Sequence, residues 1–184
     1  MEHNIYSEVT PEIIRLAKLN EQADMIATEL FTKFDVKRGL RDLNGKGVLA
    51  GLTRISDVRA NRMVDGVQIP IHGDLFYRGY NVKDLVSGFT KDDRFGFEEV
   101  TYLLLFDKLP NKKELEDFRN LLAFYRNLPT NFVRDIIMKA PSKDMMNTLA
   151  RSVLTLYSYD DRADDTSLPN VLRQCLQLIS LFPL

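Results

Sequence analysis

The part of the chain that decides the fold ends with the segment Gly73-Asp74-Leu75-Phe76-Tyr77-Arg78-Gly79-Tyr80-Asn81-Val82-Lys83-Asp84-Leu85. Four short β-compatible pieces lie within or before it: Val48-Leu49-Ala50, Thr53-Arg54-Ile55, Val67-Gln68-Ile69 and Leu75-Phe76-Tyr77. Three pairs of turn-forming residues lie before or between them: Asn44-Gly45, Asp65-Gly66 and His72-Gly73. Residues 39–85 are therefore predicted to form a few short strands or hairpins and not a large sheet.

The distribution of glycine and proline predicts that the second half of the chain is helical. All nine glycines lie between Gly39 and Gly96. Because glycine is unfavourable inside helices and useful in turns, the long stretch without glycine favours helices. Five of the seven prolines then occur at the spacing of helices joined by short connections: Pro110, Pro129, Pro141, Pro169 and Pro183.

Capping residues mark two of the predicted helices. Thr10 can cap a first helix that has Pro11 at its first position and an apolar stripe reaching Phe34. Asn111, with Glu114 three residues later, has the pattern of a capping box.

Further helices are predicted over Phe97–Phe106 and Thr130–Lys139, and from Ser142 and Ser167 onward. The last two are expected to bury Met145, Met146, Leu149, Val153 and Leu156, and Leu172, Leu176 and Ile179, respectively. The predicted fold is mainly α and has three parts: an N-terminal helix within residues 1–36, a short-strand segment at 37–86 and a helical segment at 87–184.

Composition and charge narrow the class of protein. With 184 residues, 45% of them hydrophobic, the chain can build one domain or two small ones, and its formal net charge of -1 argues against a dedicated nucleic-acid binder. No apolar run approaches the roughly 20 residues of a membrane span, and the N-terminus lacks the features of a signal peptide. One cysteine fits a reducing compartment. We expect a soluble cytoplasmic protein without a membrane partner.

The sharpest local cluster is Asp160-Asp161-Arg162-Ala163-Asp164-Asp165. Clustered carboxylates can hold Mg²⁺ against a diphosphate. The string matches the Asp-Asp-x-x-Asp pattern of all-α isoprenoid synthases, which carry it on a helix facing a cavity and need a second aspartate-rich site. No second string follows, and the flanking residues are typical of a loop between helices. A solvated acidic loop is expected, whereas a helical position would favour the magnesium enzyme.

Other candidate residues have simple structural explanations. His3 lies near the terminus and His72 in a predicted turn, too far apart in sequence for a histidine-rich metal site. Cys175 is expected to be a small core residue. Residues 36–62 carry seven basic side chains against two aspartates, which fits either phosphate contact or an ordinary solvated face. These residues indicate no metal site and no evident active site.

A longer pattern adds a family resemblance. The string Gly47-Val48-Leu49-Ala50-Gly51-Leu52-Thr53-Arg54-Ile55-Ser56, followed by Gly73 to Leu85, resembles the N-terminal signature of citrate synthases. That signature is a small strand ending in Ile-Ser and then Gly-x-Leu-x-Tyr-Arg-Gly-Tyr leading into a helix. Phe97–Leu105, Leu109-Pro110 and Leu128-Pro129 also fit, so the resemblance covers residues 37–182. It implies a citrate-synthase-like helical large domain with a few short N-terminal strands or hairpins.

Two features depart from the family pattern. Lys143-Asp144-Met145-Met146 stands where many members have a His-Pro-Met string, and the turn between Ser56 and Gly73 looks longer than usual. These departures bear on the subfamily and leave the family resemblance in place.

The resemblance implies that the complete enzyme is an acyltransferase of the tricarboxylic acid cycle. It would condense acetyl-CoA with oxaloacetate, release citrate and CoA, and work as a homodimer, with no cofactor apart from the CoA of substrate and product. A catalytic aspartate and two histidines would act as base and oxyanion donors. The family carries them in C-terminal strings such as His-Gly-Gly-Ala and Gly-x-Gly-His, which do not occur here.

The chain is therefore expected to be the N-terminal fragment of a bacterial-type citrate synthase, without catalytic residues and inactive by itself. Arg41 is the one site residue that the resemblance transfers, as a ligand of the CoA phosphates, and a surface arginine is the alternative. Two other functions stay open. One is a 2-methylcitrate synthase using propionyl-CoA, and the other is a helical interaction module without catalysis.

Overall fold

The computed structural model describes residues 8–23, 26–34, 36, 48–49 and 51–184. It divides into two compact units, which we call unit 1 (Met1–Leu19 with Glu116–Leu184) and unit 2 (Asn20–Leu115). Arg41 and His3 lie outside the described residues, as does the predicted Asn44-Gly45 turn.

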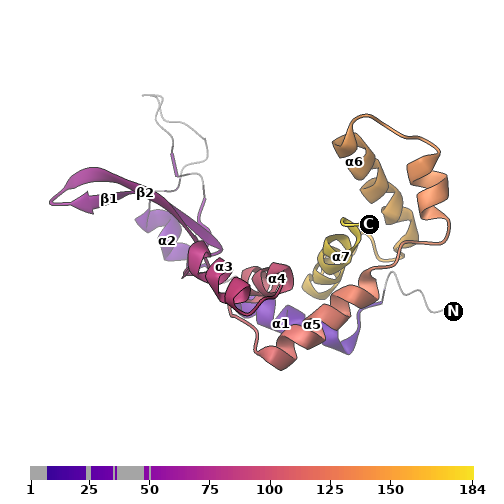
Figure 1. Cartoon of the computed structure of the whole chain (residues 1–184), viewed down its shortest axis with the longest axis horizontal. Coiled ribbons are helices and arrows are strands. Elements are labelled where there is room, and N and C mark those ends of the chain that lie inside the picture. The colour runs from indigo at the N-terminus through magenta and orange to yellow at the C-terminus, as the bar shows by residue number, and fades with distance from the viewer. Residues whose placement is uncertain (1–7, 24–25, 35, 37–47, 50) are drawn as a thin grey trace. The chain divides into compact units, whose positions relative to one another are not determined.

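Unit 2 contains a three-stranded antiparallel sheet of order β1-β2-β3. β1 (Ser56–Val64) and β2 (Val67–Tyr77) form the long ribbon seen in Figure 1, and β3 (Tyr80–Asn81) pairs with the end of β2. Asp65 and Gly66, both with positive φ, make the two-residue turn that the sequence predicts. This backbone twist matches that of the flanking strands, so the ribbon continues directly on both sides of the turn.

The predicted short strands differ from this ribbon in two places. The described residues between 48 and 55 are not in strands, and His72-Gly73 lies inside β2 and forms no hairpin turn. Register is irregular there, since the partners step from Arg59–Asp74 to Asn61–Pro70. The glycine therefore lies at an irregularity of the bulge kind, where an extra residue bends a strand without ending it.

The helices of unit 2 follow the sheet. They are α2 (Thr28–Lys33), α3 (Val82–Lys91) and α4 (Phe97–Phe106). α3 begins at a side-chain cap, because Asn81 accepts a hydrogen bond from the backbone N–H of Lys83 at 2.9 Å. Leu85 of α3 and three residues of α4 are buried in the core: Tyr102, Leu103 and Phe106.

Unit 1 is helical in its described part. It holds most of α5 (Lys112–Tyr125), the π-helical segment η1 (Val133–Met138), α6 (Met145–Leu156), the short 3-10 segment η2 (Tyr157–Tyr159) and α7 (Leu168–Leu181). The first part of α1 (Pro11–Ala23) also belongs to it. Its buried hydrophobic residues include Ile13, Leu16, Phe118, Leu122, Phe132, Leu172 and Leu176.

Both predicted caps are confirmed. The Thr10 hydroxyl oxygen accepts from the N–H of Ile13 at 3.3 Å, at the start of α1. Asn111 Oδ1 accepts from the N–H of Glu114 at 3.0 Å, and the Glu114 carboxylate accepts from the N–H of Asn111 at 2.9 Å. This reciprocal pair satisfies donors that the first turn of α5 would otherwise leave without partners.

Several predicted helices differ in extent. The first ends at Ala23, and α2 begins only at Thr28. The helix predicted over Thr130–Lys139 is the shorter η1, and the one predicted from Ser142 begins at Met145, where Asp144 provides the cap by accepting from the N–H of Asn147 at 3.1 Å. The architecture is still mainly α with one small sheet, as predicted.

Two expectations about burial are wrong. Met145 and Met146 were expected inside but are 82% and 71% exposed, and α6 has no buried residue. Cys175 is exposed because the buried face of α7 runs through Leu172, Leu176 and Ser180, which places Cys175 on another side of the helix. In the described part of the chain, no helix is long and apolar enough to cross a membrane.

Candidate functional site

Arg78, which belongs to the Tyr-Arg-Gly-Tyr signature, is a buried residue of unit 2. It follows β2 with φ 48°, and Gly79 has φ 86°, so the chain turns sharply before β3. A non-glycine residue with positive φ is uncommon and is maintained by its surroundings. Only 8% of Arg78 is exposed, and its side chain points into the protein.

The Arg78 guanidinium donates to carbonyl groups from two helices. Nε and Nη2 donate to the carbonyl oxygen of Leu104 at 3.0 and 2.7 Å, and Nη1 donates to that of Ala23 at 3.2 Å. Asn20 Nδ2 donates to the neighbouring carbonyl of Leu105 at 2.8 Å. The last carbonyls of a helix lack intrahelical partners and carry its negative dipole end, so a buried cation stabilises them.

Asp107 completes this arrangement at the end of α4. Its backbone is left-handed with φ 59°, and its carboxylate lies 3.9 Å from Arg78 Nε and 3.4 Å from Arg54 Nη2. The most specific part of the family signature thus fixes the ends of α1 and α4 against the sheet. It does not present a cation to solvent, where a substrate would bind.

The sequence carries one local signal for this role. An arginine followed by glycine between two β-pieces is typical of a tight connection, but the carbonyl partners lie 26 and 55 residues away. Pattern and spacing do not reveal contacts between residues so far apart in sequence.

We predict that Arg78→Ala lowers the free energy of unfolding by about 3 kcal/mol, because it leaves buried carbonyl groups without their donors. Arg78→Lys should recover part of the loss, since lysine keeps the charge but not the planar fork. Arg62→Ala, at an exposed position of β1, is the matched control and should change stability by no more than about 0.5 kcal/mol. Urea unfolding followed by circular dichroism measures the difference. Equal stability of Arg78→Ala and Arg62→Ala would contradict this role.

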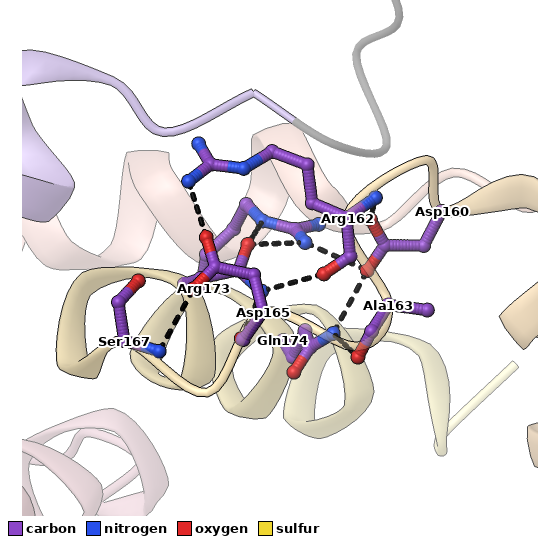
Figure 2. Close-up of polar contacts among 8 residues, drawn as sticks. Asp160, Arg162, Ala163, Asp165, Ser167, Arg173 and Gln174 are labelled. Carbon is purple, nitrogen blue, oxygen red and sulfur yellow. Dashed lines mark hydrogen bonds and ion pairs between the residues drawn. The ribbon is translucent and has the colours of Figure 1, made fainter.

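The second polar cluster is the acidic string, which forms turns between η2 and α7 (Figure 2). Asp160 Oδ2 accepts from Arg173 Nη2 at 2.6 Å and from Gln174 Nε2 at 3.0 Å, while Oδ1 accepts from the N–H of Arg162 at 3.0 Å. Arg173 is fully buried and also donates to Asn170 and Gln177. We call these residues, Asp160, Arg162, Asn170, Arg173, Gln174 and Gln177, the Asp160–Arg173 network.

The network also fixes the ends of the loop. Asn170 Nδ2 donates to the carbonyl oxygens of Arg162 and Asp165, at 2.8 and 2.7 Å. Asp165 accepts from the N–H of Ser167 at 2.9 Å and pairs with Arg162 (Figure 2), and these contacts lower the pKa of Asp165. The loop is therefore bound to the first turns of α7 by its own side chains.

The expectation of a loop is confirmed, but Asp160 is not solvated. Only 11% of its side chain is exposed. Burial opposes its ionisation, but the hydrogen bonds from Gln174 and Arg173 and from the N–H of Arg162 outweigh burial and lower the pKa of Asp160. Because the aspartates lie in a loop and two of them pair with arginines, the magnesium-dependent isoprenoid enzyme is removed as an alternative. No group of three potential metal ligands occurs among the described residues.

Two further sequence candidates are exposed. His72 is exposed on β2 in unit 2, and Cys175 is exposed on α7 in unit 1. Arg41 lies outside the described residues, so its assignment to CoA phosphates stays a prediction.

We predict that Asp160→Asn destabilises the chain by about 2–4 kcal/mol at pH 7, because it leaves the buried Arg173 without its counter-charge. The folded pKa of Asp160 lies below its unfolded value, so this stabilisation is present above about pH 4 and is lost as the pH falls through the folded pKa. Unfolding curves from pH 7 to 2 should show that the difference in the free energy of unfolding between wild type and variant becomes smaller as the pH falls. Asp161→Asn, at an exposed position, is the control. A difference between wild type and Asp160→Asn that does not change with pH would contradict the role of the Asp160 carboxylate.

The chain resembles known proteins over most of its length. The family model described as "Citrate synthase, C-terminal domain" matches residues 40–184. The citrate synthase of Haloferax volcanii is 32% identical over 132 residues, 71% of this chain and 29% of that protein. The 2-methylcitrate synthase 1 of Corynebacterium glutamicum is 31% identical over 125 residues, 68% of this chain and 27% of that protein.

The solved structures agree with this result. The crystal structure of citrate synthase from Pyrobaculum aerophilum matches with a TM-score of 0.58 and 26% identity, over 78% of this chain and 36% of that one. The chain thus spans about a quarter to a third of the length of these relatives. That it corresponds to their N-terminal part stays a prediction. The match to the family model, the relatives and the shared fold together show that the chain belongs to the citrate synthase family.

Proposed function

We propose that this chain is part of an acyltransferase that condenses acetyl-CoA with oxaloacetate and water to give citrate and CoA. The observation that carries the proposal is the family match over residues 40–184. In this proposal the chain is the N-terminal part of the enzyme and supplies the helical framework. The buried side chains of Arg78 and Arg173 stabilise that framework. Arg41 contributes a cation for the CoA phosphates, and the reaction uses no metal or cofactor apart from CoA itself.

The chain alone is proposed to be inactive. The condensation needs a base near the methyl carbon of the acyl-CoA and donors at both carbonyl oxygens, held together in one site. His72 is the one histidine among the described residues, and it is exposed on a strand with no acid or base group bonded to it there. Losing one group of such a set commonly slows a reaction by factors of thousands.

A 2-methylcitrate synthase is the second candidate, and specific relatives favour it. Proteins of that name from Corynebacterium glutamicum and Shewanella oneidensis are 31% and 36% identical over the matched segments. Propionyl-CoA differs from acetyl-CoA by one methylene, which a hydrophobic pocket discriminates by only about 1–3 kcal/mol. The choice between them is therefore made by the pocket around the acyl group.

The test begins with the DNA that follows the codon for Leu184. We expect the reading frame to continue into histidine strings of the His-Gly-Gly-Ala and Gly-x-Gly-His kinds. The polypeptide so encoded should form citrate from acetyl-CoA and oxaloacetate at roughly 10 per second, faster than it uses propionyl-CoA. Arg41→Ala should raise KM for the acyl-CoA with little change in kcat, since it removes a binding contact distant from the reacting atoms.

The 184-residue chain is the negative control for that assay. Citrate should be detected by mass spectrometry, because the exposed Cys175 would itself react with the thiol reagents used to follow CoA release. A reading frame that ends without the histidine strings would overturn the proposed synthase. Turnover by the short chain near the enzyme's rate would overturn its proposed inactivity.

We also propose that the protein is a homodimer in a reducing, cytoplasmic compartment, without nucleic-acid or membrane partners. α6 supports the dimer, because it carries one charged residue, Arg151, and its Met145, Met146 and Leu154 are 82%, 71% and 74% exposed. A groove of about 600 Å³ lies beside it, lined by Met145, Met146 and Phe182 among others. Exposed apolar surface of this extent supports a contact with another protein surface, which in this proposal is a second copy of the chain.

Light scattering should show a dimer at micromolar concentration, and Leu154→Glu should shift it towards monomer by placing a charge in the apolar face. Asn120→Glu introduces the same charge at an exposed position of α5 and should leave the dimer intact. A monomer at all concentrations, or dimers equally strong in both variants, would contradict the proposal.

A further inference from the structure

A cavity of about 200 Å³ lies beside the Asp160–Arg173 network in unit 1. It is lined by residues from the end of α5, the end of α6, η2, the acidic loop and α7. Four of the lining residues are aromatic: Phe124, Tyr125, Tyr157 and Tyr159. The cavity is larger than the ~150 Å³ that accommodates benzene in a protein interior, so it has room for a small organic molecule.

Two carboxylates are associated with this cavity, those of Asp160 and Asp164. Asp160 is one of its lining residues, and no lysine, arginine or histidine is among them. In the adjoining loop, Arg162 pairs with Asp165, and the neighbouring Arg173 pairs with Asp160. Asp164 is exposed and forms no ion pair within the described residues; its carboxylate accepts from the Tyr157 hydroxyl at 2.9 and 3.0 Å.

Tyr157 connects that carboxylate to the cavity. Its hydrogen bond to Asp164 raises the pKa of Tyr157, so the ring stays neutral while it donates towards a negative charge. Hydrogen-bonded groups polarise one another, which leaves more electron density on the ring. The faces of aromatic rings already carry the negative part of the ring quadrupole. Both effects favour a positively charged ligand.

Tyr125 is a buried aromatic residue of the same cavity. It is 6% exposed, and burial raises its pKa to about 12, so the hydroxyl remains protonated at neutral pH. The hydroxyl oxygen is buried and has no hydrogen-bond partner in the described part of the chain. Because the hydroxyl oxygen is enclosed by the protein, Tyr125 contributes its ring to the cavity wall.

We propose that this cavity binds a small organic cation of the quaternary ammonium class. Rings from several elements around a cationic head, with the Asp164 carboxylate nearby, are the arrangement that recognises such groups. A bare metal ion does not fit, because most of the lining is carbon and hard cations need several oxygen ligands. The proposal does not rest on the synthase function, and its failure would leave that function untouched.

The test compares choline with its uncharged isostere 3,3-dimethylbutan-1-ol, in which carbon replaces the charged nitrogen. Titrations followed by two-dimensional NMR, with sodium chloride balancing ionic strength, should show choline shifting the amide signals of Tyr157, Ala163 and Gln174. We expect a Kd of about a millimolar for choline and a value at least about fivefold higher for the isostere.

Variants assign the binding to the aromatic wall and the acidic loop. Tyr157→Leu should weaken choline binding at least about fivefold, while Tyr157→Phe should retain most of it because the ring remains. Asp164→Asn should weaken choline binding and leave the isostere unchanged. Tyr80→Leu removes a half-exposed tyrosine from unit 2 and should have no effect. If Tyr157→Leu does not fold, the exposed Asp164→Asn still decides the charge dependence.

Equal affinity for choline and its isostere would show a merely apolar cavity and overturn the cation assignment. Absence of shifts at these residues up to about 50 mM choline would overturn the site itself, since binding that weak would give it no specificity. Shifts confined to other parts of the chain would also contradict the proposal.

Discussion

The guanidinium of Arg78 is the contact on which the organisation of unit 2 depends. One planar group donates to the carbonyl oxygens of Leu104 and Ala23, at 2.7–3.2 Å, and holds the ends of α4 and α1 at the point where β2 turns into β3. The turn itself requires positive φ at Arg78 and Gly79. A backbone of this kind persists only where the surroundings enforce it, and the three hydrogen bonds supply that enforcement. The family signature is thus explained first by architecture and only indirectly by catalysis.

Unit 1 uses a buried arginine in a similar way. Arg173 is fully enclosed and links Asp160, Asn170 and Gln177, so the acidic loop is bound to α7. Replacing either member of such a pair leaves a buried charge without its partner, so the contributions of Arg173 and Asp160 to stability are coupled. Two of the aspartates pair with arginines, and the Asp164 carboxylate accepts from the Tyr157 hydroxyl of the aromatic cavity. The same loop therefore both organises α7 and sets the potential of the cavity.

Local features were predicted from the sequence more successfully than contacts between distant residues. The caps at Thr10 and Asn111 and the Asp65-Gly66 turn depend on residues within three or four positions, and all three appear in the structure. The fold class followed from glycine and proline placement. Arg78 belongs to the family signature, but spacing does not predict its role, because its partners are 26 and 55 residues away.

The wrong predictions have a common physical origin. The apolar pattern of α6 predicts that Met145 and Met146 lie in a core, whereas both lie on an exposed face. Periodicity identifies an apolar face but does not tell whether the chain itself or another surface covers it. Conversely, a charged string predicts a solvated loop, whereas Asp160 has a buried partner. The sequence does not show that Arg173 and Gln174, which lie in the next helix, contact the loop.

Native-state hydrogen exchange in wild type and Arg78→Lys tests the central claim most directly. Arg78 is proposed to fasten the end of α4 and the β2–β3 connection, so the variant should lose protection together at the amides of Leu103–Asp107 and Tyr80–Asn81. Amides of α7 in unit 1 should keep their wild-type rates. Unchanged protection at both sites of unit 2, or an equal loss across both units, would contradict the account.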